Sequence, residues 1–351
     1  MGRTIGTAVD RDELRVMRKK HGTGGSGSGS SVQSRVSTPA ALPDVDPRAV
    51  LAWYCDQFVL PLPDRHRFPM EKYRLLRERV ADDERIQLEI PEPATNVDLI
   101  RVHCEEYVAR VTSGGLSRDE IRRIGFPWSP ELVERSRRST GGTIHAAERA
   151  RRNGISVNLA GGTHHAFADA GEGFCVFNDV AVATRSLQAR GMAARCAVLD
   201  LDVHQGNGTA SIFRGDPTVF TLSVHGASNY PFRKEASDLD IGLEDGANDD
   251  IFLTAVRDGV TKALASGADF AFYIAGADPY EHDRLGRLSV TKAGLRERDR
   301  LVFDACEEAG VPVAVVMSGG YAEDVLDTVE IHTATVLEAA RRVSASATPP
   351  R

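Results

Sequence analysis

The chain has 351 residues, of which 42% are hydrophobic and 26% charged, with a formal net charge of −7. This composition is typical of a soluble globular protein and excludes a collagen, a coiled coil and a wholly disordered chain. No apolar run approaches the roughly 20 residues that cross a bilayer, and the acidic balance argues against direct nucleic-acid binding.

The N-terminus lacks the pattern of a secretory signal, and the five cysteines form no C-x-x-C pair. We therefore expect a reducing compartment, with neither disulfides nor a cysteine-based zinc site. The chain has 37 Arg against 6 Lys, which favours a bacterial source. The expected location is the cytoplasm, with the bacterial cytosol favoured over a eukaryotic nucleus.

Three segments are predicted along the chain. Residues 1–46 form a flexible tail, because the stretch from Gly22 to Ser31 consists only of Gly, Ser and Thr. Residues 47–343 form one folded domain, and residues 344–351 a frayed C-terminus. The first 35 residues carry a net charge of +4, so the remainder carries −11.

Short apolar runs alternate with amphipathic stretches over the folded part. The runs predict strands at 155–159, 195–201, 218–224, 269–275 and 312–317. The amphipathic stretches predict helices at about 129–152, 178–190, 249–265, 291–309 and 325–343. This alternation predicts a single three-layer α/β/α domain around a mostly parallel sheet.

Most of the apolar runs end in glycine and reactive polar residues. The five breaks begin at Gly161, Asp202, Ser223, Gly276 and Ser318. In open α/β sheets, ligands bind outside the carboxyl ends of the strands. We therefore expect these loops to converge on one site.

The segment that ends the second run predicts a metal site. Alternate residues of a strand share a face, so Asp200, Asp202 and His204 should project together. Such a buried cluster is costly unless a cation compensates it. Asp278, after the next run, adds a ligand and leaves a position open for water or substrate. Oxygen and nitrogen ligands suit Zn²⁺, with Fe²⁺ as the alternative. The other interpretation is that these acids only cap the following helices.

Two further loops carry candidates for proton transfer and hydrogen bonding. His164 and His165 follow two glycines, and histidine is the natural proton carrier near neutral pH. Asp200 and Asn207 are candidate orienting partners for them. Tyr321 also follows two glycines, and its hydroxyl suits a developing oxyanion. Taken singly, the histidines could equally be a metal clamp and the tyrosine a packing residue. Together the parts predict metal-assisted hydrolysis of an amide or related acyl bond.

These motifs resemble those of the zinc-dependent histone deacetylases, most closely the class IV and bacterial branch. The resemblance extends from about Tyr54 to Val336 and is carried by four motifs in order: GGTHHAFADAGEGFCVFN from Gly161, LDLDVHQGNGT from Leu199, GADPYEHDRLG from Gly276 and SGGY from Ser318. It implies an arginase-like fold with an eight-stranded sheet, so that residues 47–343 form a deacetylase-like catalytic domain.

The resemblance also implies a role for each matching residue. Asp202, His204 and Asp278 would ligate zinc, and Tyr321 would stabilise the oxyanion. His164, paired with Asp200, and His165 would be the tandem catalytic histidines. Gly173 and Phe174 would line the tunnel for an acyl-lysine side chain. A potassium ion is implied near Asp200, Asp202, His204, Ser223 and Val224.

One position departs from part of the family. Class I members usually have Asp where this chain has Asn207, so the residue that orients His165 is neutral. Its imidazolium should then be less stabilised, and the residues leave open which histidine is the base.

The predicted function is a zinc-dependent deacylase that removes an acetyl or longer acyl group from lysine side chains. The alternatives are a deacetylase of polyamines or other small amides, a binuclear manganese ureohydrolase of the arginase type, and an inactive module that binds acyl ligands. Gly206 stands where the ureohydrolases have a second bridging Asp, which favours one metal. The acidic body favours cationic substrates. The sequence leaves the oligomeric state open.

Overall fold

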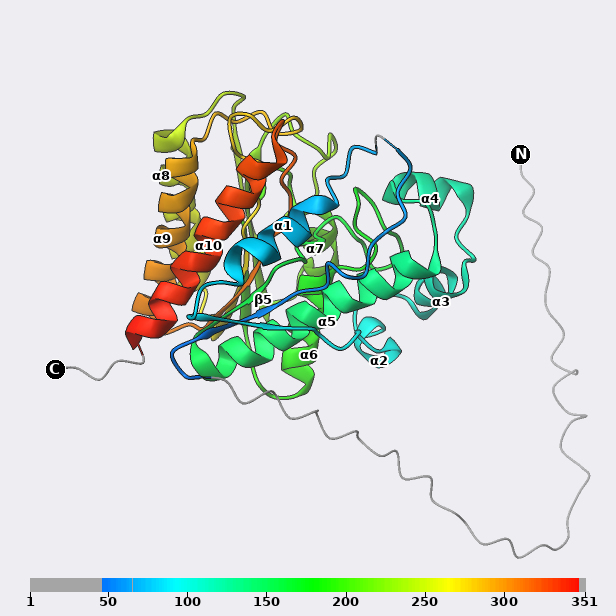
Figure 1. Ribbon diagram of the computed structural model, residues 1–351, viewed down its shortest axis with the longest axis horizontal. Helices are drawn as coiled ribbons and strands as arrows, with labels where there is room; N and C mark the ends of the chain where they lie inside the picture. Colours follow the sequence, from blue (N-terminus) through cyan, green and yellow to red (C-terminus); the bar gives the residue numbers. More distant parts are fainter. Residues whose placement is uncertain (1–45, 65, 347–351) are drawn as a thin grey trace, which may run out of the picture. The chain divides into compact units, whose positions relative to one another are not determined.

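The computed structural model describes residues 46–64 and 66–346. Eight strands form one sheet in the order β2-β1-β3-β8-β7-β4-β5-β6, and every neighbouring pair is parallel (Figure 1). The strands are β1 (Val50–Trp53), β2 (Ile86–Glu89), β3 (Ile155–Asn158), β4 (Cys196–Asp200), β5 (Val219–Gly226), β6 (Leu239–Leu243), β7 (Phe270–Ile274) and β8 (Val313–Val316). The predicted α/β class and the eight-stranded sheet are confirmed.

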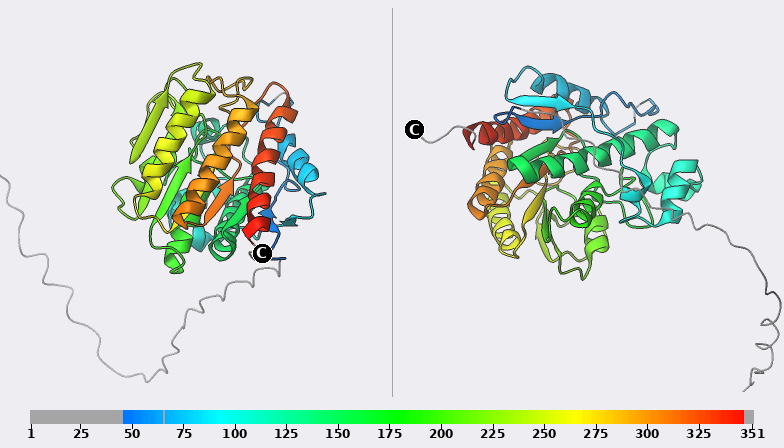
Figure 2. Two further views of the ribbon diagram at one scale, coloured as in Figure 1. Left: turned by 90° about the vertical axis from the view of Figure 1, so that its left-hand side faces the viewer. Right: turned by 90° about the horizontal axis from the view of Figure 1, so that it is seen from below.

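Helices cover both faces of the sheet, as Figure 2 shows. One layer holds α1 (Glu71–Val80), α8 (Asp249–Leu264), α9 (Lys292–Ala309) and α10 (Val325–Ser346), which pack side by side. The other holds α5 (Pro130–Asn153) and α6 (Asp179–Ala189), with α7 (Asn207–Phe213) beside α6. The shorter helices are α2 (Asn96–Leu99), α3 (Glu105–Ser113) and α4 (Arg118–Ile124). No helix within the described residues combines the length and apolar character needed to cross a membrane.

The five predicted strands and five predicted helices are present, with ends shifted by at most three residues. The sequence analysis missed β1, β2 and β6. In β2 and β6 apolar residues alternate with polar residues or glycine, so these strands lack the continuous apolar run that marked the central ones. The strand β1 is apolar and buried but has only four residues.

The predicted segment boundaries fall near the limits of the described residues. The tail predicted over 1–46 lies outside them, except for Asp46. At the other end, α10 continues to Ser346, three residues into the segment predicted to fray, and 347–351 lie outside the described residues.

The central strands contribute much of the apolar core, and the candidate site residues lie at or beyond their carboxyl ends. Every residue of β4 and β7 is buried. Leu199, Leu201 and Val203 are fully buried in the apolar core, as expected for one face of this segment. One detail of the prediction is wrong: β4 ends at Asp200, so Asp202 and His204 lie in the irregular segment beyond it.

Candidate active site

A cavity of about 450 Å³ opens at the carboxyl ends of β3, β4, β7 and β8. Each of these strands is followed by a loop that contributes to its lining. The contributed side chains include His164, His165, Asp202, His204, Asp278 and Tyr321. Four of the five predicted loops therefore converge, because parallel pairing brings the carboxyl ends of the strands to one edge. The break predicted at Ser223 is wrong, since this residue lies within β5, which continues to Gly226.

Three side chains in this cavity form a candidate metal centre. The nearest ligand atoms of Asp202, His204 and Asp278 all lie within 4.8 Å of one another, and the three residues are buried. His204 Nδ1 lies 3.0 Å from Asp202 Oδ1 and 3.2 Å from Asp278 Oδ2. This is the one group of three or more such ligands that the described part of the chain contains.

Of the four oxygens of the two carboxylates, only Asp278 Oδ2 lacks a hydrogen-bond partner among the described residues, and Asp202 Oδ1 accepts from the His204 amide at 3.0 Å. Asp202 Oδ2 accepts from Ser318 Oγ at 2.8 Å and from the Gly319 amide at 2.9 Å. Asp278 Oδ1 accepts from the Val203 amide at 3.0 Å. Asp278 Oδ2 is buried without a hydrogen-bond partner. A buried carboxylate oxygen that no donor satisfies, aimed at a second carboxylate and an imidazole, fits a divalent cation.

The electrostatics of the cluster point the same way. Burial and the neighbouring Asp202 raise the pKa of Asp278 to about 7. Burial opposes a charge on His204, yet its hydrogen bond to Asp202 and the nearby Asp278 carboxylate raise its pKa to about 10. Gly319 brings its backbone so close that a Cβ there would collide with Asp278 Oδ2. The loop after β8 is thus shaped around the ligands, and zinc or another divalent cation fits the donor set.

The tandem histidines are buried next to the ligands, and their partners differ. His164 Nδ1 lies 2.7 Å from Asp200 Oδ2, and His165 Nδ1 lies 2.7 Å from Asn207 Oδ1. Burial favours neutral His164, but Asp200 and Asp202 outweigh it and raise its pKa to about 9. Burial, with His164 and His204 nearby, holds the pKa of His165 well below its ordinary value. The pKa values of the two adjacent histidines are thus shifted in opposite directions.

A hydrogen-bond chain behind His165 selects its tautomer. Asn207 Nδ2 donates to Glu172 Oε1 at 3.1 Å, which turns Asn207 Oδ1 toward His165. The Tyr230 hydroxyl donates to the same Glu172 oxygen. Because an amide oxygen only accepts, His165 carries its proton on Nδ1 and leaves Nε2 free to accept one.

Tyr321 is buried beside the ligand cluster. Its backbone amide donates to Asp283 Oδ2 at 2.6 Å, and Lys72 Nζ lies 5.4 Å from its ring centroid. Burial, followed by the nearby Asp278, raises its pKa well above 10. The hydroxyl therefore stays protonated and able to donate a hydrogen bond.

Gly173 and Phe174 line the cavity as predicted. Both have positive φ, and a Cβ on Gly173 would lie 2.7 Å from His165 Cδ2. The Phe174 ring lies 5.3 Å from Phe68 and 5.1 Å from Phe126, centroid to centroid. An aromatic cluster thus fixes one wall of the cavity.

The predicted potassium residues lie on adjacent strands. Ser223 of β5 pairs in register with Asp200 of β4, and Val224 follows it. Ser223 Oγ hydrogen-bonds His225 Nδ1 at 2.9 Å. The potassium site stays a prediction.

The sequence analysis assigned no role to Glu172 or Lys72. Glu172 lies within the sequence GEGF, in which Gly173 and Phe174 predicted a wall of the tunnel. Nothing in this motif indicated that Glu172 accepts hydrogen bonds. Lys72 of α1 is buried, and its Nζ donates to the Ser318 carbonyl at 3.1 Å and to the Gly320 carbonyl at 3.5 Å. It holds the loop that carries Tyr321. No sequence signal could identify it, because the contact spans 246 residues.

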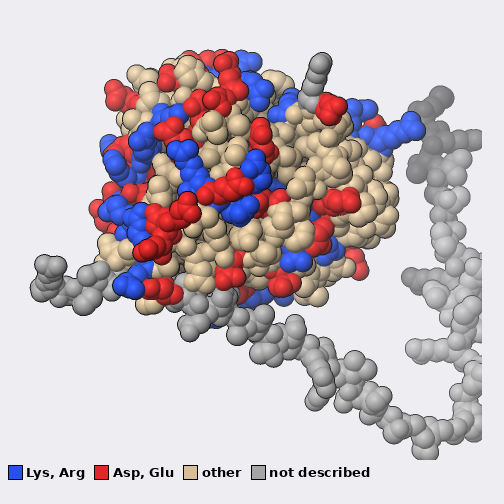
Figure 3. Space-filling view, in the orientation of Figure 1, with Lys and Arg blue, Asp and Glu red and all other residues tan. Residues whose placement is uncertain are grey.

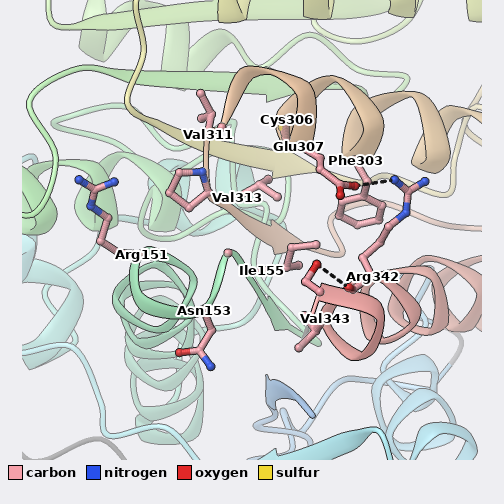
Figure 4. Close-up of a pocket in the computed structure, with 14 residues that line it drawn as sticks. Arg151, Asn153, Ile155, Phe303, Cys306, Glu307, Val311, Val313, Arg342 and Val343 are labelled. Atoms are coloured by element: carbon pink, nitrogen blue, oxygen red, sulfur yellow. Dashed lines mark hydrogen bonds and ion pairs between the residues drawn. The ribbon is translucent and has the colours of Figure 1, made fainter. Parts of the chain in front are cut away.

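A second cavity, of about 380 Å³, lies at the opposite edge of the sheet, where β3 and β8 begin (Figure 4). Its floor is apolar, and Arg342 pairs with Glu307 at 3.3 Å. Burial raises the pKa of the Cys306 thiol to about 12. The described residues that line it include no histidine, so it offers no comparable chemistry.

Comparisons with known proteins show what the chain as a whole is similar to. Residues 65–337 match the model of the histone deacetylase domain. An uncharacterized protein of Picosynechococcus is 46% identical over 80% of this chain and 95% of its own length. Histone deacetylase 2 of Arabidopsis thaliana is 31% identical over 73% of this chain and 70% of its own. The crystal structure of an HDAC homolog from Aquifex aeolicus superposes with a TM-score of 0.71 at 22% identity, covering 84% of each chain.

Proposed function

Because the chain belongs to the histone deacetylase family, a family of deacetylases and amidohydrolases, we propose that it is a metal-dependent deacylase of lysine side chains. The observation that carries the proposal is the buried Asp202, His204 and Asp278 set beside a histidine pair whose partners are Asp200 and Asn207. Zinc is the proposed cation, with Fe²⁺ as the alternative and a potassium ion beside it. One three-ligand group within the described residues supports one catalytic cation rather than the two of a ureohydrolase.

A divalent cation held by these ligands polarises an amide carbonyl and lowers the pKa of water. The residues around it supply the proton transfers. His165 Nε2 accepts a proton from the attacking water and returns it to the departing amine, which suits a neutral imidazole fixed by Asn207. His164, kept cationic by Asp200, stabilises the negative charge that develops on the carbonyl oxygen.

The first prediction concerns the Tyr321 hydroxyl. Tyr321→Phe is expected to lower kcat by roughly 10²–10³-fold, because one oxyanion donor contributes about that much. Cation content by elemental analysis should stay at the wild-type level, since the hydroxyl is not among the proposed ligands. Unchanged turnover would remove Tyr321 from the mechanism.

The second prediction concerns Glu172, a positioning residue that acts through Asn207. Glu172→Gln is expected to lower kcat by roughly 10-fold, in line with other outer partners of metal sites. Loss of its charge should also depress the His165 pKa further, so the acidic limb of the kcat–pH profile moves to lower pH. Glu281→Gln, at an exposed position that lies outside the cavity lining, is the control and should change neither quantity.

The substrate is tested by a turnover panel with the purified full chain. Acetyl-, octanoyl- and myristoyl-lysine peptides are compared with acetylspermidine, after chelation and again after adding Zn²⁺, Fe²⁺ or Mn²⁺. The proposal expects cation-dependent hydrolysis of at least one acyl-lysine peptide. Hydrolysis of acetylspermidine alone would favour the small-amide alternative. Binding of all substrates without turnover under every cation would favour the inactive module.

A further inference from the structure

The charged side chains at the mouth of the active-site cavity are basic. Apart from the candidate ligands and the two histidines, the charged side chains that line it are Arg67, Arg123 and Arg287. No Glu, and no Asp outside the ligand set, is among the described residues of the lining. The chain as a whole is acidic, so this local excess of positive charge runs against its net charge of −7.

Each arginine is attached to the wall of the cavity and exposes its guanidinium. Arg67 lies over the Phe174 ring at 5.0 Å. The Arg123 carbonyl accepts a hydrogen bond from the Gly173 amide at 3.1 Å, so its backbone is tied to the same wall. Neither side chain has an ion pair with a described residue. Arg287 lies 3.2 Å from Asp245, but both side chains are about half exposed, at 54% and 47%, and such pairs are weak.

Two acidic side chains outside the lining accept hydrogen bonds from residues that form it. Asp283 accepts hydrogen bonds from the backbone amides of Leu285, Gly286 and Tyr321. Glu172 holds Asn207 and Tyr230. Elsewhere the surface differs: over α8, α9, α10 and α1, basic and acidic side chains are interspersed (Figure 3) and form ion pairs such as Lys292–Asp327.

These charges act on the part of the substrate that stays outside. The candidate ligands and histidines lie at the buried end of the cavity, so the acyl group must enter, while the carrier of the amine remains at the mouth. Arginine binds carboxylates well, through two parallel hydrogen bonds. We propose that the preferred substrate is a protein segment in which the acyl-lysine is flanked by Asp or Glu. This inference rests on the proposed deacylase function, and it reverses the preference for cationic substrates expected from net charge.

The test compares three acetyl-lysine peptides of equal length, with acidic, neutral or basic flanking residues. At about 20 mM salt, kcat/KM is expected to be about 10-fold higher for the acidic than for the basic peptide, and the ratio should approach one at about 300 mM. A ratio of one or less at low salt overturns the proposal. So does faster hydrolysis of acetylspermidine than of every peptide, because its carrier is cationic.

Two sets of variants test whether the three arginines of the cavity cause the preference for the acidic peptide. Changing Arg67, Arg123 and Arg287 together to Gln should bring the ratio of kcat/KM between the acidic and the basic peptide close to one. The control changes Arg122, Arg296 and Arg300, three exposed arginines outside the cavity lining, and should keep the wild-type ratio. The single variant Arg123→Glu should raise turnover of the basic peptide. A wild-type ratio in the first triple variant overturns the proposal.

Binding measurements separate this inference from the proposed function. If none of the peptides is hydrolysed, the deacylase proposal fails, whereas fluorescence anisotropy of the same labelled peptides still reports the charge preference. The proposal is supported if the acidic peptide binds more tightly than the basic peptide and the Arg67, Arg123 and Arg287 triple variant loses this difference. Equal or weaker binding of the acidic peptide overturns it. Thermal unfolding of each variant verifies that the fold is intact.

Discussion

Replacing His165 by alanine is expected to lower kcat by roughly 10³-fold, within the range that a positioned proton carrier contributes. The reason is its hydrogen bonding: Asn207 fixes the proton on Nδ1 and leaves Nε2 to accept one. The cation content per chain should not change, because His165 is not one of the three converging ligands. Single-turnover kinetics with an acetyl-lysine peptide, alongside elemental analysis, measure both quantities.

The matched control for this experiment is His282→Ala. His282 is exposed on the loop after β7, outside the cavity lining, and should retain wild-type turnover. A His165→Ala variant that kept more than about a tenth of wild-type kcat would exclude this residue as the base. The proton carrier would then have to be His164, with Asp200 as its partner.

The second large effect is expected from Asp278→Asn, which should lower affinity for the divalent cation by at least about 100-fold and abolish turnover at limiting metal. Loss of outer partners alone costs about 10–100-fold in affinity, so loss of a ligand costs more. The substitution is nearly isosteric and keeps the Oδ1 bond from the Val203 amide. The changed atom, Oδ2, has no hydrogen-bond partner to lose. Isothermal titration with Zn²⁺ measures the affinity.

The stability of the metal-free protein gives an independent readout. Folding raises the pKa of Asp278 from 3.8 to about 7. A carboxyl with a raised folded-state pKa destabilises the fold increasingly as pH rises through that interval, and the cost is fully present above it. At about pH 7.5 the metal-free variant should therefore melt at the same or a higher temperature than the metal-free wild type.

Adding the cation should reverse that order. Saturating zinc stabilises the wild type by several degrees, as expected for a ligand that binds only the folded state, and leaves Asp278→Asn nearly unchanged. Asp258→Asn, on the exposed face of α8, should behave like the wild type in both states. An Asp278→Asn variant that gained as much stability from zinc as the wild type would place the cation elsewhere.

The two histidines show how similar neighbours acquire different properties. They are adjacent in sequence, and their ring centroids are 4.1 Å apart. His164 meets the carboxylate of Asp200, which favours its cation, whereas His165 meets the neutral amide of Asn207. Once one ring is charged, its neighbour is less readily protonated. The question of which is the base, left open by the residues, is answered in our proposal by these partners.

The sequence alone was enough to predict the central strands of the sheet and the residues of the candidate site. Strands β3, β4, β5, β7 and β8 are buried on both faces and read as continuous apolar runs, so they were predictable from local pattern. Their ends were marked by glycine and polar residues, and parallel pairing then required those ends to meet. The sequence pattern therefore predicted that Asp202, His204 and Asp278 lie together.

Tertiary structure decided the features that depend on contacts between distant segments. Glu172 reaches Asn207 across 35 residues, and Lys72 reaches Ser318 across 246. The basic mouth likewise gathers arginines from helix α4 and from two loops, although net charge predicted the opposite local sign. Local periodicity indicates which face of a strand or helix is buried. Which polar side chains of distant segments contact each other depends on how the loops pack. The burial and the hydrogen-bond partners of these side chains then set the charge states on which the proposed chemistry depends.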